Sequence, residues 1–265
     1  MSQSLQRRDF LTLCAGIVLA PQNLLTAADE TPDRDLQKIL RELPHAKPHI
    51  PRIQAACEKY APLYPVPLVW PAKMVAIESA YNPDAISNSY AVGSAQFMPA
   101  TAREMGAHVP PAEEFAKQEE VLTLRRQYQS KFEEAVASFR RGDDSLAAHH
   151  REKARTLQQM HDEIHMKTMT EFKEKVFAMT VDERRKYDAR FDPAVSDDLM
   201  VHYMAVLCRA VKKELNLIDD AHILLLAAVA YNAGIGNVKR KSGIPVVSQN
   251  VEYANKLMLF HSLKL

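Results

Sequence analysis

Apolar residues recur at three- and four-residue spacing along most of the chain, and this spacing is typical of amphipathic or buried helices. Helices are expected at 53–60, 68–79, 199–215, 223–238 and 251–260. Alternating apolar and polar residues, the pattern of half-buried strands, are sparse. The sequence therefore predicts a mainly α fold.

Two segments between these helices lack a helical pattern. Residues 43–53 are rich in proline and are predicted to form a loop or an extended segment. Residues 82–95 are polar and contain Pro83 and Gly93, so we expect a loop with room for a small hairpin. Pro99 is then well placed to begin another helix.

Residues 111–188 differ in character from the rest of the chain. They are rich in Glu, Lys, Arg and Gln, and Gly142 is their single glycine. Apolar residues line one helical face on each side of it: Val121, Leu124, Tyr128, Phe132, Val136 and Phe139 before, and Leu157, Ile164, Phe172 and Val176 after. Asp144 or Ser145 is expected to cap the second helix. The pattern predicts an antiparallel helical hairpin whose remaining charges form a solvated face.

Length and charge narrow the classes of protein to consider. A chain of 265 residues can hold one large domain, or a domain with an appendage. The formal net charge is only +1, which gives no basic footprint for a polyanion. Nucleic acid is therefore not an expected partner.

Residues 1–28 are interpreted as an export signal. Arg7 and Arg8 precede an apolar run, 11–20, that is too short to span a bilayer. The Arg-Arg-x-Phe-Leu pattern resembles a twin-arginine signal, and Thr26-Ala27-Ala28 offers small residues for cleavage. The alternative is a buried N-terminal helix in which the arginines occur by chance. We expect an exported protein of the periplasm or cell envelope.

Two cysteines, Cys57 and Cys208, lie beyond the expected signal. An oxidising compartment permits a disulfide between them. Two buried free thiols are the alternative, and the sequence leaves both open.

Glu78 is an acidic residue in an unusual place, in the last turn of the apolar helix 68–79. The partial negative charge of a helix C-terminus and the apolar neighbours both disfavour a carboxylate, so both raise its pKa. Lys73 lies five residues back on another side of the helix. A glutamate with a pKa near neutrality can act as a general acid. A frayed glutamate at a helix end is the alternative.

Three blocks of residues, in order along the chain, resemble the soluble lytic transglycosylase family, relatives of goose-type lysozyme. They are ESAYNPDAIS at 78–87, AVGSAQFMPATA at 91–102 and AVAYNAGIGNV at 228–238, with a weaker FDP…YM likeness at 191–204. The blocks cover less than half of the chain. The resemblance implies a lysozyme-like domain in two parts, 29–110 and 189–265, interrupted by the hairpin at 111–188.

The resemblance also assigns roles to residues. Glu78 matches the catalytic acid/base of the family. Six further residues match substrate-binding positions: Ser87, Gln96, Met98, Tyr231, Asn232 and Tyr253. Tyr231 and Asn232 match residues that reach the catalytic glutamate and the acetamido group of the sugar. Met98 and Tyr253 lie at apolar spacings, so a purely structural role in the core is their alternative.

The sequence departs from the family pattern at several places. Tyr90 stands where glycine is usual, Ser94-Ala95 replace bulkier apolar residues, Met200 replaces a glycine, and Gln249-Asn250 replace Glu-Thr. None of these changes removes the acid. They bear on the shape of the sugar-binding groove, so the reaction type is better predicted than the substrate preference.

The hairpin histidines do not form a recognisable metal motif. His161 and His165 are one helical turn apart, but the spacing is not H-E-x-x-H and fixes no third ligand. A solvated helix face is the favoured interpretation, and no metal or cofactor is expected.

Glu78 is the only carboxylate placed within a motif, and this bears on the type of reaction. Most glycosidases use two carboxylates, and Asp84 occupies a variable position of the family pattern. The resemblance implies a lytic transglycosylase that cleaves the MurNAc–GlcNAc β-1,4 bond of peptidoglycan strands and leaves a 1,6-anhydromuramoyl end. The alternatives are a hydrolytic muramidase on the same fold, and a non-catalytic wall-binding scaffold. The scaffold would use the hairpin 111–188 to dock a protein partner, and this role is compatible with an active enzyme.

Overall fold

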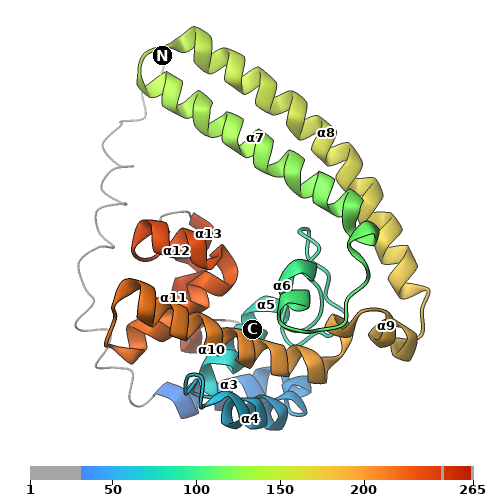
Figure 1. Ribbon diagram of the computed structural model, residues 1–265, viewed down its shortest axis with the longest axis vertical. Coiled ribbons are helices and arrows are strands. Elements are labelled where there is room, and N and C mark those ends of the chain that lie inside the picture. The colour runs from blue at the N-terminus through green and yellow to red at the C-terminus, as the bar shows by residue number, and fades with distance from the viewer. Residues whose placement is uncertain (1–30, 246–247, 264–265) are drawn as a thin grey trace, which may run out of the picture.

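The computed structural model describes residues 31–245 and 248–263, and helices dominate this part of the chain (Figure 1). The export signal expected at 1–28 lies outside the described residues. The helices are α3 (Thr31–Glu42), η2 (Pro44–Ala46), α4 (His49–Tyr60), α5 (Val69–Ser79), α6 (Pro99–Glu104), η3 (Ala112–Phe115), α7 (Ala116–Arg140), α8 (Asp144–Phe177), α9 (Val181–Tyr187), η4 (Ala189–Phe191), α10 (Pro193–Leu215), α11 (Asp220–Ala233), α12 (Ile235–Lys241), α13 (Ser248–Met258) and η5 (Phe260–Ser262), where η marks a 3₁₀ helix. The prediction of a mainly α fold is confirmed.

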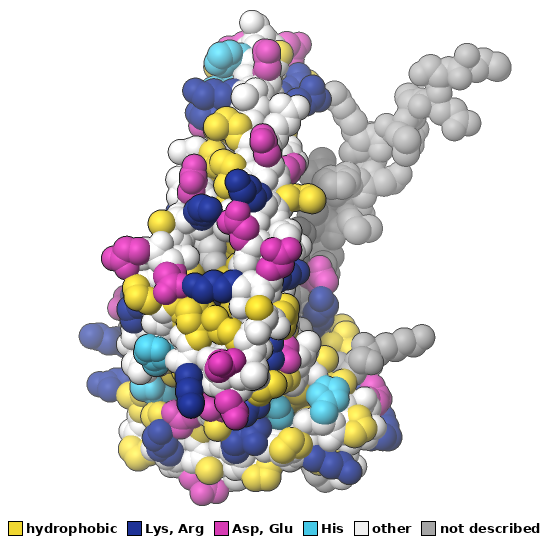
Figure 2. All heavy atoms as spheres, turned by 90° about the vertical axis from the view of Figure 1, so that its right-hand side faces the viewer, with side chains coloured by type: hydrophobic (Ala, Val, Ile, Leu, Met, Phe, Trp, Pro, Cys, Tyr) yellow, Lys and Arg dark blue, Asp and Glu magenta, His cyan; other side chains and the backbone are white. Residues whose placement is uncertain are grey.

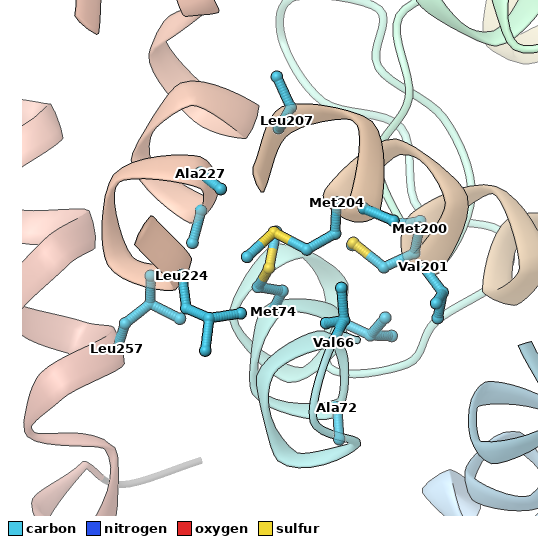
Figure 3. Close-up of a cluster of buried hydrophobic side chains, with 14 of the residues drawn as sticks. Val66, Ala72, Met74, Met200, Val201, Met204, Leu207, Leu224, Ala227 and Leu257 are labelled. Atoms are coloured by element: carbon cyan, nitrogen blue, oxygen red, sulfur yellow. The ribbon is translucent and has the colours of Figure 1, made fainter. Parts of the chain in front are cut away.

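Helix α5 lies at the centre of the main body. It is enclosed by α3, α4, α10 and α13, and α10 also packs along α4 and α11. In Figure 3, Met74 of α5 points toward Met204 of α10 and Leu224 of α11. A helix that is apolar on nearly all sides is stable only when it is surrounded in this way. Burying each such side chain contributes about 1.5–3 kcal/mol.

The two long helices predicted from the sequence are present as α7 and α8. They pack against each other along their length and project away from the main body (Figure 1). Acidic and basic side chains are interspersed along the face of the hairpin in Figure 2. The capping residue is Asp143, whose Oδ1 accepts a hydrogen bond of 2.9 Å from the amide of Leu146. The prediction of Asp144 or Ser145 was therefore wrong by one or two positions.

The proline-rich segment 43–53 does not form the expected loop or extended segment. Its residues form the 3₁₀ turn η2 and the first turn of α4. Pro44, Pro48 and Pro51 all lie at or beside a helix start, where the missing backbone N–H leaves no hydrogen bond unmade. The prolines begin helices here instead of excluding them.

Cys57 on α4 and Cys208 on α10 are both buried free thiols. Burial raises the pKa of Cys57 to about 11 and that of Cys208 to about 12. Thiolates therefore do not form near neutral pH, and both cysteines serve as small core residues. Of the two alternatives left open by the sequence, the structure shows free thiols.

Across residues 31–245 and 248–263, none of the helices combines the length and the apolar character needed to cross a membrane.

Candidate active site

Glu78 lies in the last turn of α5, immediately before a sharp reversal of the chain. Ala80 and Tyr81 both adopt the left-handed conformation, with φ of 52° and 63°. This conformation is uncommon for residues other than glycine and costs of order 1 kcal/mol or more for each. The Tyr81 hydroxyl donates a 2.8 Å hydrogen bond to the carbonyl of Ala72, which ties the reversal to α5. The turn is thus held by a buried side chain, and it leaves Glu78 at the end of the central helix.

The Glu78 carboxyl group is partly removed from water and poorly compensated. The residue as a whole is half-buried, but Oε1 is enclosed and has no hydrogen-bond partner among the described residues. Burial raises the pKa of Glu78 to about 7, and the nearby Tyr253 opposes this rise. The Tyr253 hydroxyl is also buried and has no hydrogen-bond partner of normal geometry among the residues that the structure describes. Lys73 instead binds Asp35 at 3.2 Å, so it does not neutralise the site.

Two tyrosines from distant elements approach Glu78. Tyr231 comes from α11 and Tyr253 from α13. Burial and the charge of Glu78 raise the pKa of both phenols well above their usual range, so both stay protonated. The Tyr231 hydroxyl donates a 2.6 Å hydrogen bond to the carbonyl of Ala95. Three of the predicted site residues therefore meet in space.

The loop that follows α5, residues 82–97, is called the site loop below. It contains two isolated antiparallel bridges, Ile86 with Val92 and Val92 with Phe97, which give the small hairpin that the sequence predicted. The side chains of Gln96 and Ser87 both form hydrogen bonds within the loop. The Gln96 amide donates to the carbonyl of Gly93 at 2.8 Å, and Ser87 Oγ accepts from the amide of Ala91 at 2.9 Å.

The predicted sugar-binding roles of Gln96 and Ser87 stay predictions, because the hydrogen bonds that these side chains form stabilise the loop itself. Met98 is half-buried at the start of α6, and Asn232 is exposed beside Tyr231. Met98 directly follows the site loop, and Asn232 directly follows Tyr231 on α11.

Arg190 is a structural determinant of the site that the sequence analysis missed. It is fully buried, and its guanidinium forms a bidentate pair with Asp188, with Nη2 2.7 Å from Oδ2. The same guanidinium donates from Nη1 to the carbonyls of Phe97 at 2.7 Å and Tyr90 at 3.3 Å. Both carbonyls belong to the site loop, so this ion pair holds the loop backbone in place. The only signal in the sequence was its position just before the FDP likeness.

Gly93 lies against the same anchor. A Cβ atom at this position would be 1.9 Å from the carbonyl oxygen of Arg190, and φ is +82°. Ser196 Oγ donates to that carbonyl at 2.7 Å and holds it in place. Only glycine fits both the backbone conformation and the close approach.

The histidine pair of the hairpin shows no sign of a metal centre. His161 and His165 stack with their ring centroids 5.2 Å apart. No group of three or more His, Cys, Asp and Glu side chains with suitable geometry occurs within the described ranges.

Replacing Glu78 by glutamine is expected to stabilise the protein at pH 8 by about 1–3 kcal/mol, because glutamine carries no charge to desolvate. The folded-state pKa of Glu78, about 7, lies above its ordinary 4.5. Between these values the folded state binds more protons than the unfolded state, so stability falls as pH rises through this window. Urea unfolding at pH 5 and pH 8 measures this. A variant with the same pH dependence as the wild type would show that Glu78 is not desolvated.

Residues 58–121 match the family model described as the transglycosylase SLT domain. The matched segment runs from the end of α4 to the start of α7 and includes Glu78 and the whole site loop. The match confirms the resemblance to soluble lytic transglycosylases drawn from the residue blocks. Searches of curated proteins and of solved structures gave no match.

Proposed function

We propose, from the transglycosylase SLT domain that this chain carries, that the protein is a lytic transglycosylase of the bacterial cell wall. It would cleave the MurNAc–GlcNAc β-1,4 bond of peptidoglycan and leave a 1,6-anhydromuramoyl end. The observation that carries the proposal is the enclosed carboxyl group of Glu78, whose Oε1 has no hydrogen-bond partner in the described part of the chain and whose pKa burial raises to about 7. Such a group is protonated in a large fraction of molecules near neutral pH and is free to meet a substrate.

Glu78 would act twice in one turnover. Its carboxylic acid donates a proton to the glycosidic oxygen as the bond from that oxygen to C1 of the muramoyl sugar breaks. Its carboxylate then takes the proton from the C6 hydroxyl as the C6 oxygen bonds to C1. No water is consumed, and Glu78 ends protonated as it began. The attacking hydroxyl belongs to the same sugar, so its effective concentration is high without an activating base of its own.

The surroundings of Glu78 favour this one-carboxylate route over hydrolysis. Among residues 31–245 and 248–263, the groups that shift the pKa of Glu78 include no second carboxylate. The nearest acidic residue of the site loop in the sequence, Asp84, is bound by Arg184 of α9 at 3.0 Å. An inverting or retaining glycosidase needs a second free carboxyl group to bind water or to attack the sugar. Asp84 is poorly suited to that task while its charge is paired.

The substrate class sets the proposed location. An enzyme that acts on peptidoglycan works in the cell envelope, which agrees with the export signal proposed at 1–28. The domain limits 29–110, 111–188 and 189–265, and a protein partner for the hairpin, are likewise proposals.

Mass spectrometry of the sugars released from purified peptidoglycan tests the function. We expect muropeptides with 1,6-anhydromuramic acid ends, which are lighter by one water than the corresponding reducing-end products. Products with reducing muramic acid would identify a hydrolytic muramidase. Retention of the protein on peptidoglycan without any release would favour the wall-binding scaffold.

A further inference from the structure

The helical hairpin touches the site loop directly. The Tyr90 hydroxyl of the loop lies 3.1 Å from Nδ1 of His165 on α8. On α7, Arg125 donates a 2.7 Å hydrogen bond from Nη1 to Ser89 Oγ of the loop. Both helices of the hairpin therefore form hydrogen bonds with adjacent residues of the site loop, and this pair of contacts is called the grip of the hairpin below.

Tyr90 is held in place by the packing of its ring as well as by its hydroxyl. The ring is fully buried and meets His165 and Phe172 of α8 edge-to-face, with centroids 5.7 and 6.3 Å apart. It belongs to a cluster of buried residues that joins the loop, the hairpin and η4: Tyr90, Val92, Phe115, Val121, Met169, Phe172, Val176 and Phe191. The loop thus shares a core with the hairpin, separate from the larger core of the main body.

The contact between Tyr90 and the hairpin stabilises an unfavourable backbone conformation of Tyr90. Its φ is +65°, a left-handed conformation that favours glycine over tyrosine. The ring contacts with the hairpin offset this local cost, which is of order 1 kcal/mol. Tyr90 precedes Val92, which pairs with Phe97, and the loop carbonyl of Ala95 accepts the hydrogen bond from Tyr231 beside Glu78. The hairpin is therefore linked to the region of the candidate acid through Tyr90, the paired loop backbone and Tyr231, whose phenol lies within the electrostatic influence of Glu78.

We infer that the hairpin is a positioning element for the site loop, that Tyr90 is the residue through which it acts, and that His165 makes its grip sensitive to pH. The consequence for catalysis rests on the proposed function, whereas the grip on the loop does not. Tyr90 and His165 are positioning residues, because they bond to each other and act on Glu78 only through the loop and Tyr231.

The groups around His165 determine the direction of the pH effect. They are Tyr90 of the loop, Arg125 of α7, and His161, Asp162 and Lys173 of α8. Burial, and then the positive charges that His161 and Arg125 can carry, lower the pKa of His165, and Asp162 opposes them only in part.

The neutral ring meets the Tyr90 hydroxyl through Nδ1, whereas a protonated ring would place a positive charge in a half-buried position beside Arg125. A released His165 would regain its ordinary pKa of 6.5 and take up a proton more readily than the docked one. Docking is therefore fully favoured above about pH 6.5 and weakens as the pH falls below that value.

Hydrogen exchange of the full chain tests the grip without any substrate. The amides of Ala91, Val92 and Gly93 bond within the loop and report its opening. In Tyr90→Phe we expect their exchange at pH 7.5, corrected for intrinsic rates, to rise about fivefold, the effect of one lost hydrogen bond. In the wild type the corrected rates should rise between pH 7.5 and pH 5.5, and in His165→Phe they should change little.

Two matched variants separate loop opening from general loss of stability. Tyr64→Phe removes a buried phenol that donates to Asp220 far along the chain from the loop. His149→Phe changes an exposed histidine on the same helix as His165. Neither should alter the exchange of the loop amides or its pH dependence. Loop exchange that is the same in Tyr90→Phe as in Tyr64→Phe, and independent of pH in the wild type, would overturn the inference.

Enzyme kinetics distinguish this inference from the proposed function. If the wild type releases anhydro-muropeptides, its acid limb below pH 6.5 should be reduced in His165→Phe, and kcat should fall more than KM changes in Tyr90→Phe. A wild type that releases nothing, but whose loop exchange follows the pattern above, would refute the lytic transglycosylase and leave the grip of the hairpin intact. An unaltered acid limb in His165→Phe would show that His165 does not control the loop during turnover.

Discussion

Glu78→Gln is expected to reduce the release of anhydro-muropeptides by about 10²–10⁴-fold, the usual contribution of a general acid–base group. Glutamine has nearly the shape of glutamic acid, but it neither donates a proton to the glycosidic oxygen nor takes one from the C6 hydroxyl. The loss should appear in kcat more than in KM, because the proton transfers occur only at the transition state. Release rates from purified peptidoglycan, measured by mass spectrometry, give this comparison.

The pH dependence of the wild-type rate provides a second test of the role of Glu78. Because the pKa of Glu78 is about 7, the protonated fraction falls as pH rises through neutrality, and the rate should fall with it. Glu58→Gln is a matched control, since Glu58 is an exposed glutamate in the last turn of α4. It should leave both rate and profile unchanged. Substantial turnover by Glu78→Gln would assign the proton transfers to another group.

Glu78 and the central helix could be predicted because their signals are local. An acidic residue at the end of an apolar helix carries its own desolvation and dipole penalty, and the structure shows a carboxyl group with an enclosed oxygen and a raised pKa. The hairpin was predicted for a similar reason, since three-four periodicity over more than twenty residues leaves few alternatives. Gly142 marked the break, although the cap lies at Asp143.

The remainder of the site depends on contacts between distant segments, which periodicity does not encode. Arg190 reaches Phe97 and Tyr90 across 93 and 100 positions of sequence. Tyr90 was noted only as a departure from a family glycine, and its burial against the hairpin could not be read from its neighbours in sequence. The prolines at 43–53 illustrate a different limit, because proline both breaks helices and begins them.

The candidate site forms only when the segments before and after the hairpin come together. Glu78 and the site loop precede α7, whereas Tyr231 and Tyr253 follow α8. The bond from Tyr231 to Ala95 spans 136 positions. Because α7 and α8 pack against each other, their pairing brings the flanking segments together and shortens the effective loop that folding must close.

Arg190→Met is expected to destabilise the protein by about 3–5 kcal/mol, the usual cost of breaking a buried ion pair on one side. The substitution leaves the Asp188 carboxylate, which is fully buried, without its partner. It also removes the donor from the carbonyls of Phe97 and Tyr90, so the site loop loses its anchor. Urea unfolding at pH 7 measures the loss. The control Lys59→Met disrupts an exposed pair with Asp198 and should cost no more than about 1 kcal/mol.

The double variant Asp188→Leu/Arg190→Met separates the charge from the anchor. Removing both charges should recover part of the lost stability, since apolar replacements of a buried ion pair are often neutral or better. It cannot restore the hydrogen bonds to the carbonyls of Phe97 and Tyr90. The loop amides should therefore still exchange faster than in the wild type, and any loss of turnover should remain. A double variant with wild-type loop exchange would show that the tyrosine and glycine contacts hold the loop without Arg190. Stability that recovers while the loop stays open would instead locate the function of this ion pair in the conformation of the site.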